Sequence, residues 1–216
     1  MIPNHKNPKT LYQNNVLIDP MFENSTLIKG GGGMVPTRRP IYTLVDDGLV
    51  LVGDSACQVN PIHGGGIGAG MRAGIILGEV AKRAIARNDL SAWGLWHYNI
   101  RYLTNFGKRL AALEIFRRLL QSVSDEDMDF GFKKRILEAG DLMAANRGDG
   151  LSLGAIDKIR RFGRGVSRIS LLRDLQKASG LMRKISKTYD AYPTSPSGLE
   201  GWNDSVLAII EAAEFG

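Results

Sequence analysis

The sequence has a single cysteine, Cys57, and no long apolar run. One cysteine cannot form an internal disulfide bond, which fits a reducing compartment. A transmembrane helix requires about 20 consecutive apolar residues, so no membrane-spanning segment is expected. The first residues, Met1–Lys9, are polar and lack the apolar core of a secretion signal. We therefore expect a cytoplasmic protein.

Several familiar site motifs are also missing. The sequence shows no Cys and His spacing of a zinc site, no paired carboxylates and no nucleophile–base set. No metal is therefore expected. The aromatic–basic motifs of RNA-binding modules are absent as well, so nucleic acid is not expected as a partner.

Positive charge is concentrated in one region. Between Arg147 and Lys187 lie 11 Lys or Arg and 3 Asp or Glu, whereas the net charge of the whole chain is +6. A basic region of this kind fits an anionic membrane surface, and it also fits the solvated face of a helix. Both interpretations stay open.

The most informative stretch of the chain combines a strand-like run, an acidic residue, a rigid turn and a glycine-rich loop. In order, it contains Leu49–Val52, Gly53, Asp54, Asn60, Pro61, Gly64, Gly65, Gly66 and Ile67. The short run of Leu and Val predicts a buried strand, and Asn-Pro predicts a turn. Glycines before a helix let backbone N–H groups approach a ligand. The stretch therefore predicts a site for an oxygen-rich ligand with many hydroxyls.

This motif resembles the second flavin-binding motif of the geranylgeranyl reductase family, FAD enzymes in the larger group that includes p-hydroxybenzoate hydroxylase. In the family the motif runs Gly-Asp-Ala/Ser-Ala, then Asn-Pro, then three glycines and Ile. The preceding segment, 31–40, also resembles the family's lead-in. The resemblance implies FAD as the cofactor, bound by Gly53, Asp54, Asn60, Pro61, Gly64, Gly65, Gly66 and Ile67.

The resemblance also implies roles for individual groups. Asp54 would hydrogen-bond a ribityl hydroxyl or an oxygen near the phosphate, and the glycine loop would face the N1/O2 edge of the flavin ring. His63 is a weak candidate for a proton donor, and capping the loop is the commoner role for a lone histidine. Cys57 reads as a small buried apolar residue. Arg38 and Arg39 either meet a phosphate or carboxylate, or have a structural role.

The first glycine motif of such enzymes is not present. FAD enzymes of this group begin with a strand, a Gly-x-Gly-x-x-Gly turn and a helix. Gly68-x-Gly70-x-x-Ala73 matches loosely, but it lies inside a predicted helix and not directly after a strand. The resemblance therefore implies the C-terminal half of a longer reductase, with a separate N-terminal half that carries the first motif.

The rest of the chain predicts a strand-rich start followed by helices. Short β-like runs occur at 15–18 and 26–28, and Asp46-Asp47-Gly48 predicts a turn. Expected helices cover 68–87, 93–123 with a break near Gly107, a segment from Ser124, 151–161, 169–187 and 202–214, with Ser91 as an N-cap and a loop at 192–198. We predict the α+β class, as the C-terminal part of an FAD-binding α/β fold of the p-hydroxybenzoate hydroxylase type. Residues 1–90 would end the flavin-binding sheet region, and 91–216 would be a helical region.

Aromatic residues recur along the segment 93–116. They are Trp93, Trp96, Tyr98, Tyr102, Phe106 and Phe116. Packing in a helical core is the favoured interpretation, and the lining of a lipid-chain cavity is the alternative.

The resemblance implies the reduction of isoprenoid C=C bonds of geranylgeranyl groups in membrane-lipid biosynthesis. The substrate would be a prenylated lipid, and the electron donor NAD(P)H or ferredoxin. Such an enzyme would be cytoplasmic or peripheral to the membrane. The alternatives are a flavin-dependent monooxygenase of the same superfamily, or a truncated, non-catalytic helical module on a membrane surface.

Overall fold

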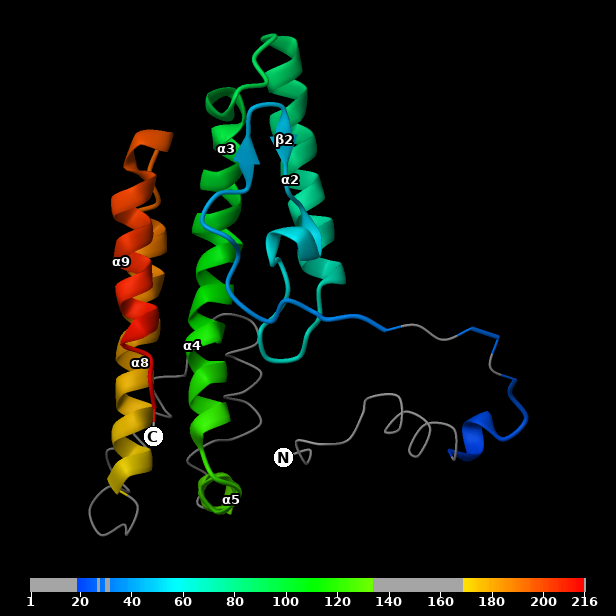
Figure 1. Ribbon diagram of the computed structural model, residues 1–216, viewed down its shortest axis with the longest axis vertical. Coiled ribbons are helices and arrows are strands. Elements are labelled where there is room, and N and C mark those ends of the chain that lie inside the picture. Colours follow the sequence, from blue (N-terminus) through cyan, green and yellow to red (C-terminus); the bar gives the residue numbers. More distant parts are fainter. Residues whose placement is uncertain (1–18, 27, 30–31, 134–168, 216) are drawn as a thin grey trace. The chain divides into compact units, whose positions relative to one another are not determined.

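The computed structural model describes residues 19–26, 28–29, 32–133 and 169–215 (Figure 1). The chain divides into two units, Met1–Met34 and Val35–Gly216. The described part of the first unit contains one 3₁₀ turn, η1 (Pro20–Phe22), which is capped by the side chain of Asp19. Of the β-like runs predicted in this unit, 15–18 lies outside the described residues. Thr26 and Ile28 are not in a strand, so that prediction was wrong for them.

The second unit begins with a β-hairpin. Strands β1 (Val45–Asp46) and β2 (Leu49–Val50) pair antiparallel, with Asp46 opposite Leu49. The predicted turn is confirmed, and Gly48 adopts the left-handed φ of 69° that a tight turn requires. The prediction of a buried strand was wrong, because Leu49 is 51% exposed. A two-stranded ribbon has no neighbouring strands to cover it.

Helices α2 (Ile67–Ala86) and α3 (Ala92–Tyr102) follow and pack against one another. The buried residues of α2 recur at three- and four-residue intervals, which gives the helix one apolar face; they are Ala73, Ile76, Val80 and Ala84. Ser91 caps α3 as predicted, because its side chain accepts the N–H of Gly94. Figure 1 shows the hairpin alongside this helix pair, and β1 contacts α3.

The predicted break near Gly107 is a π-helical turn. This turn, η3 (Leu103–Gly107), joins α3 to α4 (Lys108–Ser122). A Cβ atom at Gly107 would lie 2.8 Å from Leu103 Cδ2 and 3.4 Å from Tyr189 Cε1, so a larger residue there would require the Leu103 side chain to shift. π-Helical turns inside α-helices are rare and often lie at functional sites.

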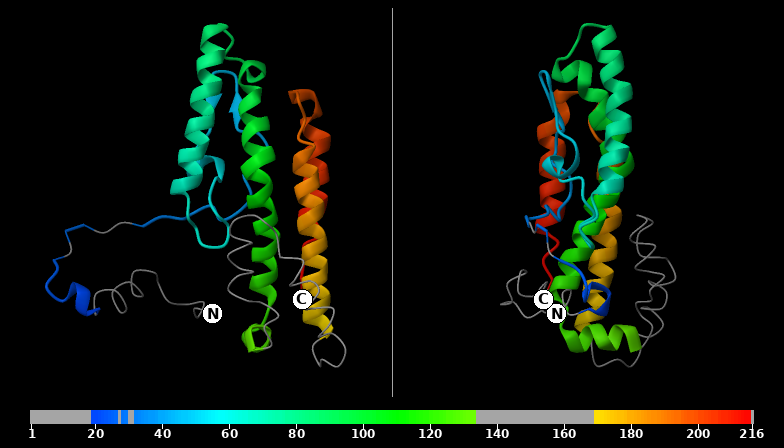
Figure 2. Two further views of the ribbon diagram at one scale, coloured as in Figure 1. Left: turned by 180° about the vertical axis from the view of Figure 1, so that it is seen from behind. Right: turned by 90° about the vertical axis from the view of Figure 1, so that its right-hand side faces the viewer.

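Three more helices are described. They are α5 (Asp125–Lys133), α8 (Ile169–Asp190) and α9 (Leu199–Glu211), with a 3₁₀ turn η4 (Pro196–Gly198) in the predicted loop. Helix α8 packs against α4, and α9 packs against α8. Both views in Figure 2 show α8 alongside α4. The buried hydrophobic residues of α8 alternate at four and three residues, as in a coiled-coil seam; they are Leu171, Leu175, Ala178, Met182, Ile185 and Tyr189. The helix predicted at 151–161 lies outside the described residues.

The described chain is mostly helical with a small two-stranded sheet, which is compatible with the predicted α+β class. The predicted boundary near residue 90 stays a prediction. Among the described helices, none has the length and apolar character needed to cross a membrane.

Candidate functional site

The Gly-Asp motif forms a 3₁₀ turn directly after the hairpin. This turn, η2 (Gly53–Ala56), starts at Gly53 with a left-handed φ of 72°. The N–H of Gly53 donates to Oε1 of the buried Gln58 at 2.7 Å, and Nε2 of Gln58 donates to the hydroxyl of Tyr98 at 3.0 Å. Gln58 therefore fixes the turn to α3, a role that its position in the sequence did not indicate.

Asn60 organises the glycine loop. Its N–H donates to the carbonyl of Gly65 at 3.1 Å, and its carbonyl accepts the N–H of Gly64 at 2.9 Å. Its side-chain Oδ1 accepts the N–H of Ile62 at 2.8 Å, which is an Asx turn. The turn predicted at Asn60-Pro61 is confirmed, and Gly64 has a φ of 73°.

His63 stabilises the same loop. Its Nδ1 accepts the N–H of Gly65 at 3.0 Å, and the side chain is exposed. This contact matches the loop-capping role, and proton donation by His63 stays a prediction.

The structure brings the Gly-Asp turn to the start of α2. A Cβ atom at Gly66 would lie 3.0 Å from Oδ1 of Asp54 and 3.3 Å from Val59 Cγ2, and one at Gly70 would lie 3.8 Å from Gly53 Cα. The carboxylate of Asp54 is exposed and makes no hydrogen bond to other described residues. No side chain caps the first turn of α2.

These two groups complement each other chemically. A helix N-terminus offers N–H donors and a partial positive charge, while a carboxylate accepts hydrogen bonds from hydroxyls. The arrangement can therefore hold a ligand that has both acceptor oxygens and hydroxyl groups.

A cleft of about 820 Å³ opens beside the glycine loop. Its walls come from the loop, the first turns of α2, the π-helical turn and the start of α4. Tyr102 and Phe106 line it, whereas Trp96, Tyr98 and Phe116 are buried in the core. Core packing is thus confirmed for most of the aromatic series, and Trp93 departs from it because it is 65% exposed.

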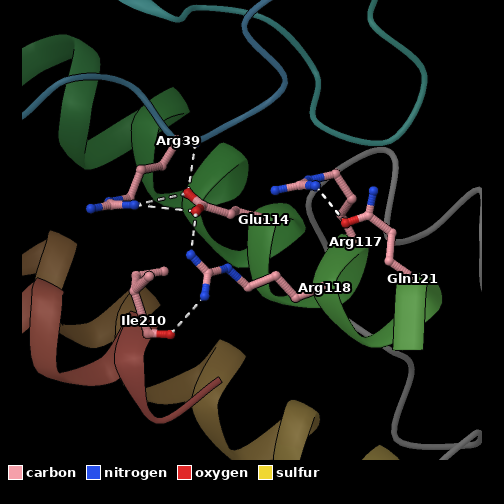
Figure 3. Close-up of polar contacts among 6 residues, drawn as sticks. All are labelled: Arg39, Glu114, Arg117, Arg118, Gln121 and Ile210. Carbon is pink, nitrogen blue, oxygen red and sulfur yellow. Dashed lines mark hydrogen bonds and ion pairs between the residues drawn. The ribbon is translucent and has the colours of Figure 1, made fainter. Parts of the chain in front are cut away.

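Arg39 and Glu114 form a buried ion pair (Figure 3). Oε2 of Glu114 lies 2.8 Å from the backbone nitrogen of Arg39 and 3.1 Å from its Nη1. Burial by itself raises the pKa of Glu114, but the N–H and guanidinium of Arg39 and the charge of Arg118 outweigh it and leave the pKa lowered. Arg39 therefore meets a carboxylate of its own chain, while Arg38 is exposed.

Arg118 extends this cluster to α9. Its Nη2 donates to Glu114 Oε1 at 3.3 Å, and its Nη1 donates to the carbonyl of Ile210 at 3.1 Å (Figure 3). Sequence reasoning missed Glu114. The available signal was a single charged residue within the apolar run from Leu110 to Phe116.

Cys57 is half-buried and has a left-handed φ of 54°. Burial raises the pKa of its thiol, although the positive charges of Arg38 and Arg39 act in the opposite direction. No group of three His, Cys, Asp or Glu that could hold a metal occurs in the described parts of the chain. The raised pKa favours the protonated thiol at neutral pH.

Comparisons with known proteins identify several digeranylgeranylglycerophospholipid reductases as relatives. The chain is 42% identical to a digeranylgeranylglycerophospholipid reductase of Sulfolobus acidocaldarius over 191 residues, which are 88% of this chain and 42% of that protein. It is 40% identical to reductase 1 of Methanococcoides burtonii over 52% of the chain and 28% of that protein. It is 33% identical to reductase 2 of Methanothermobacter thermautotrophicus over 72% of the chain and 34% of that protein.

The chain thus spans less than half the length of these relatives. No protein-family model matches it. The resemblance drawn from the glycine and Gly-Asp motifs is confirmed by the relatives.

Proposed function

Because the chain is a relative of the geranylgeranyl reductases, we propose that it is part of an FAD-dependent oxidoreductase that reduces isoprenoid C=C bonds of membrane lipids. The single observation that supports this most is the contact between Asp54 and the uncapped start of α2 at Gly66. The Gly-Asp part and the glycine-loop part of the motif lie next to each other at this point.

The residues at this place fit a flavin. A side chain at Gly66 would press on the Asp54 carboxylate, so the glycine keeps the approach to the helix N-terminus open. Asp54 would accept a hydrogen bond from a ribityl hydroxyl. The N–H groups of the first turn of α2 would face the pyrimidine edge, where negative charge gathers on reduction, and so favour the reduced form.

When bound, FAD would supply a hydride to one alkene carbon, and a proton would complete the reduction at the other carbon. The electrons would come from NAD(P)H or ferredoxin. The part of this chain is to hold the ring, to orient it through the glycine loop, and to keep the site dry. His63 could donate this proton only from Nε2, because its Nδ1 accepts the N–H of Gly65 within the loop.

The adenine end of FAD requires a partner segment. We propose that an N-terminal half with the strand–Gly-x-Gly-x-x-Gly–helix unit completes a fold of the p-hydroxybenzoate hydroxylase type. One face of α2 is available for it, because Ile67 is 86% exposed and Met71 and Ile75 are each 66% exposed. Such an apolar stripe on a helix is typical of a surface that a partner covers.

The basic region between Arg147 and Lys187 is the surface that would bind the membrane. Within it the structure describes α8, which exposes Arg173, Arg183 and Lys184. Cationic side chains attract anionic headgroups. We propose a cytoplasmic enzyme that meets the membrane surface to take up a prenylated lipid.

The test is flavin uptake by the chain combined with the N-terminal part of the Sulfolobus acidocaldarius relative. We expect a yellow complex that reduces a geranylgeranyl lipid. Asp54→Ala should weaken FAD binding about tenfold or more, since a hydrogen bond to a charged group is lost. Asp204→Ala, an exposed change on α9, is the matched control and should leave FAD binding unchanged.

Two results would contradict the proposal. A colourless complex would exclude the flavoprotein, and a non-catalytic helical module would then explain the chain. Oxygen consumption that depends on NAD(P)H and substrate would indicate a monooxygenase instead of a reductase.

A further inference from the structure

A second cleft lies at the far end of α2 from the glycine loop. It has a volume of about 580 Å³ and runs between the last turns of α2 and the first turns of α3. Arg83 and Arg87 line it at the end of α2, and Trp93 and His97 line it from α3. Arg83 lies about 24 Å along the helix axis from Ile67, at about 1.5 Å per residue. None of the described residues that line this cleft is assigned to the flavin, so the cleft is separate from the candidate site.

The two arginines are placed to hold an anion together. They are exposed and lie four positions apart, so their Cβ atoms share one face of the helix end about 5–6 Å apart. Neither guanidinium forms a hydrogen bond or an ion pair with another described residue. Guanidinium groups bind phosphate oxygens in a bidentate manner. A diphosphate has acceptor oxygens on two adjacent groups, so it can engage both arginines.

Trp93 gives the cleft a flat apolar wall. Its side chain is 65% exposed, whereas Trp96 and Trp202 are buried. An exposed indole ring offers a face on which a nucleobase can stack, whatever the hydrogen-bonding pattern of the base. His97 follows one turn later on α3 and supplies a further hydrogen-bond donor to the cleft.

Asp89 places a carboxylate in the same cleft. Its Oδ1 accepts the hydroxyl and the backbone N–H of Ser91, at 2.6 and 3.1 Å, and these bonds lower the pKa of the carboxyl. Its Oδ2 has no hydrogen-bond partner among the described residues. A Cβ atom at Gly94 would lie 2.8 Å from Oδ1, so this glycine lets the carboxylate lie against the first turn of α3. An ionised carboxylate with an oxygen to spare can accept a hydrogen bond from a ribose hydroxyl.

We propose that this cleft binds a nucleoside diphosphate. The base stacks on Trp93, and a ribose hydroxyl donates to Asp89. The phosphates accept hydrogen bonds from Arg83 and Arg87. An aromatic face, a carboxylate and two guanidinium groups match the three parts of such a ligand, and the volume lies within the range of small-molecule sites. None of these groups takes part in the proposed binding of flavin or lipid, so the site stands independently of the proposed function.

Calorimetric titration of the purified chain with ADP, adenosine and pyrophosphate tests the site. ADP should bind at least about tenfold tighter than either fragment, because ADP alone reaches both the indole ring and the arginines. It should also change the tryptophan fluorescence, since Trp93 is the exposed one of the three tryptophans. Equal affinities for ADP and pyrophosphate would overturn the nucleoside part, and a chain that does not bind ADP would overturn the whole proposal.

Two variants separate the parts of the ligand. Arg87→Gln should weaken ADP binding about tenfold and leave adenosine binding unchanged. Trp93→Ala should weaken ADP and adenosine binding about tenfold and leave pyrophosphate binding unchanged. Lys82→Gln is the matched control, because Lys82 is exposed on α2 beside Arg83 but does not line the cleft. An equal loss of ADP affinity in Arg87→Gln and Lys82→Gln, with intact circular dichroism spectra, would indicate general charge attraction and overturn the site.

FAD itself contains an ADP unit, so the two sites are distinguished by two further measurements. Asp54→Ala should keep the ADP affinity, because Asp54 does not line this cleft. Loss of ADP binding in Asp54→Ala would place the nucleotide at the flavin site and contradict the proposal. Arg87→Gln should keep FAD uptake in the complex with the N-terminal part. A chain that binds ADP but takes up no FAD in that complex would contradict only the flavoprotein.

Discussion

The carboxylate of Glu114 accepts both the backbone N–H of Arg39, at 2.8 Å, and its guanidinium, at 3.1 Å, although the two residues are 75 positions apart. Arg39 is 8% exposed and Glu114 is 3% exposed. The pair fixes the segment before the hairpin to α4. This segment leads along the chain into the hairpin and then into the Gly-Asp turn of the candidate site.

Replacement of Glu114 should destabilise the fold strongly. Glu114→Ala leaves the Arg39 guanidinium buried without a partner, and breaking a buried pair in this way lowers the free energy of unfolding by about 3–5 kcal/mol. Urea denaturation followed by circular dichroism measures the change. Glu79→Ala is the control, because Glu79 is paired with Arg101 at the surface and its loss should change stability by less than about 1 kcal/mol. Equal effects of the two changes would contradict the buried pair.

The same residue should give stability a dependence on acid pH. The pKa of Glu114 is lowered from 4.5 in the folded chain. The unfolded chain therefore binds the proton more readily, so the stabilisation is complete above pH 4.5 and is lost as the pH falls through the lowered pKa. The urea midpoint of the chain should fall more steeply below pH 4.5 than that of Glu114→Gln. Parallel pH profiles would show that other carboxylates account for the acid sensitivity.

A methyl group at Gly66 should block flavin binding, whereas one at Gly68 should not. A Cβ at Gly66 meets the Asp54 carboxylate at 3.0 Å and Val59 at 3.3 Å, but a Cβ at Gly68 has no neighbour within 4 Å. Gly66→Ala should therefore weaken FAD uptake about tenfold or more if it displaces the Asp54 hydrogen bond. Gly68→Ala should keep FAD uptake and stabilise α2 by up to about 1 kcal/mol. A similar loss of FAD binding in both variants would argue against the Asp54–Gly66 contact as the flavin-binding site.

Cys57 should react slowly with alkylating reagents. Burial raises the pKa of its thiol, so little thiolate is present at neutral pH. Iodoacetamide labelling followed by mass spectrometry should be much slower for the folded chain than for the chain in urea. A rate in the folded chain that equals the unfolded rate would mean that the thiol is accessible and ionised.

A charge on the exposed stripe of α2 should prevent association with the N-terminal half. Met71 and Ile85 are exposed to nearly the same extent, at 66% and 67%, but Met71 lies in the stripe near the glycine loop and Ile85 near the other end of the helix. Met71→Glu should abolish co-purification of the two halves, because burial of an unpaired charge is strongly unfavourable. Ile85→Glu should leave it unchanged. Co-purification that survives Met71→Glu would place the contact elsewhere.

Sequence reasoning succeeded where one short stretch decides the structure. Asn60 forms its turn with its own side chain, which accepts the N–H of Ile62. Ser91 caps α3 by accepting the N–H of Gly94, three residues further along the chain. The break near Gly107 was predicted because this glycine interrupts an otherwise continuous helical pattern, but the sequence did not indicate that the break is a π-helical turn. Such features depend on local backbone and side-chain chemistry, which a sequence displays directly.

The features that escaped prediction depend on distant contacts. The sequence left two roles open for Arg39. Its partner, Glu114, lies on α4, and the sequence alone does not show which carboxylate lies next to Arg39 in the fold. Gln58 gains its role from Tyr98 on α3, and Arg72 stacks on Phe106 in η3. The Leu49 strand was expected to be buried because its composition suits a sheet interior, yet exposure follows from the number of neighbouring strands.

The π-helical turn between α3 and α4 also sets the rotation of α3 about its own axis relative to α4. A π turn accommodates one residue more than a continuous α-helix, and each α-helical residue advances the side-chain direction by about 100°. Deletion of one residue within Leu103–Gly107 would therefore leave a continuous α-helix with α3 and α4 nearly in their present register, and Tyr98 would keep its contact with Gln58. Deletion of one residue from α3 or α4 themselves would instead rotate the two helices by about 100° relative to each other. Single deletions should therefore be better tolerated in these five positions than in the flanking helices, and a deletion scan would show this as a local maximum.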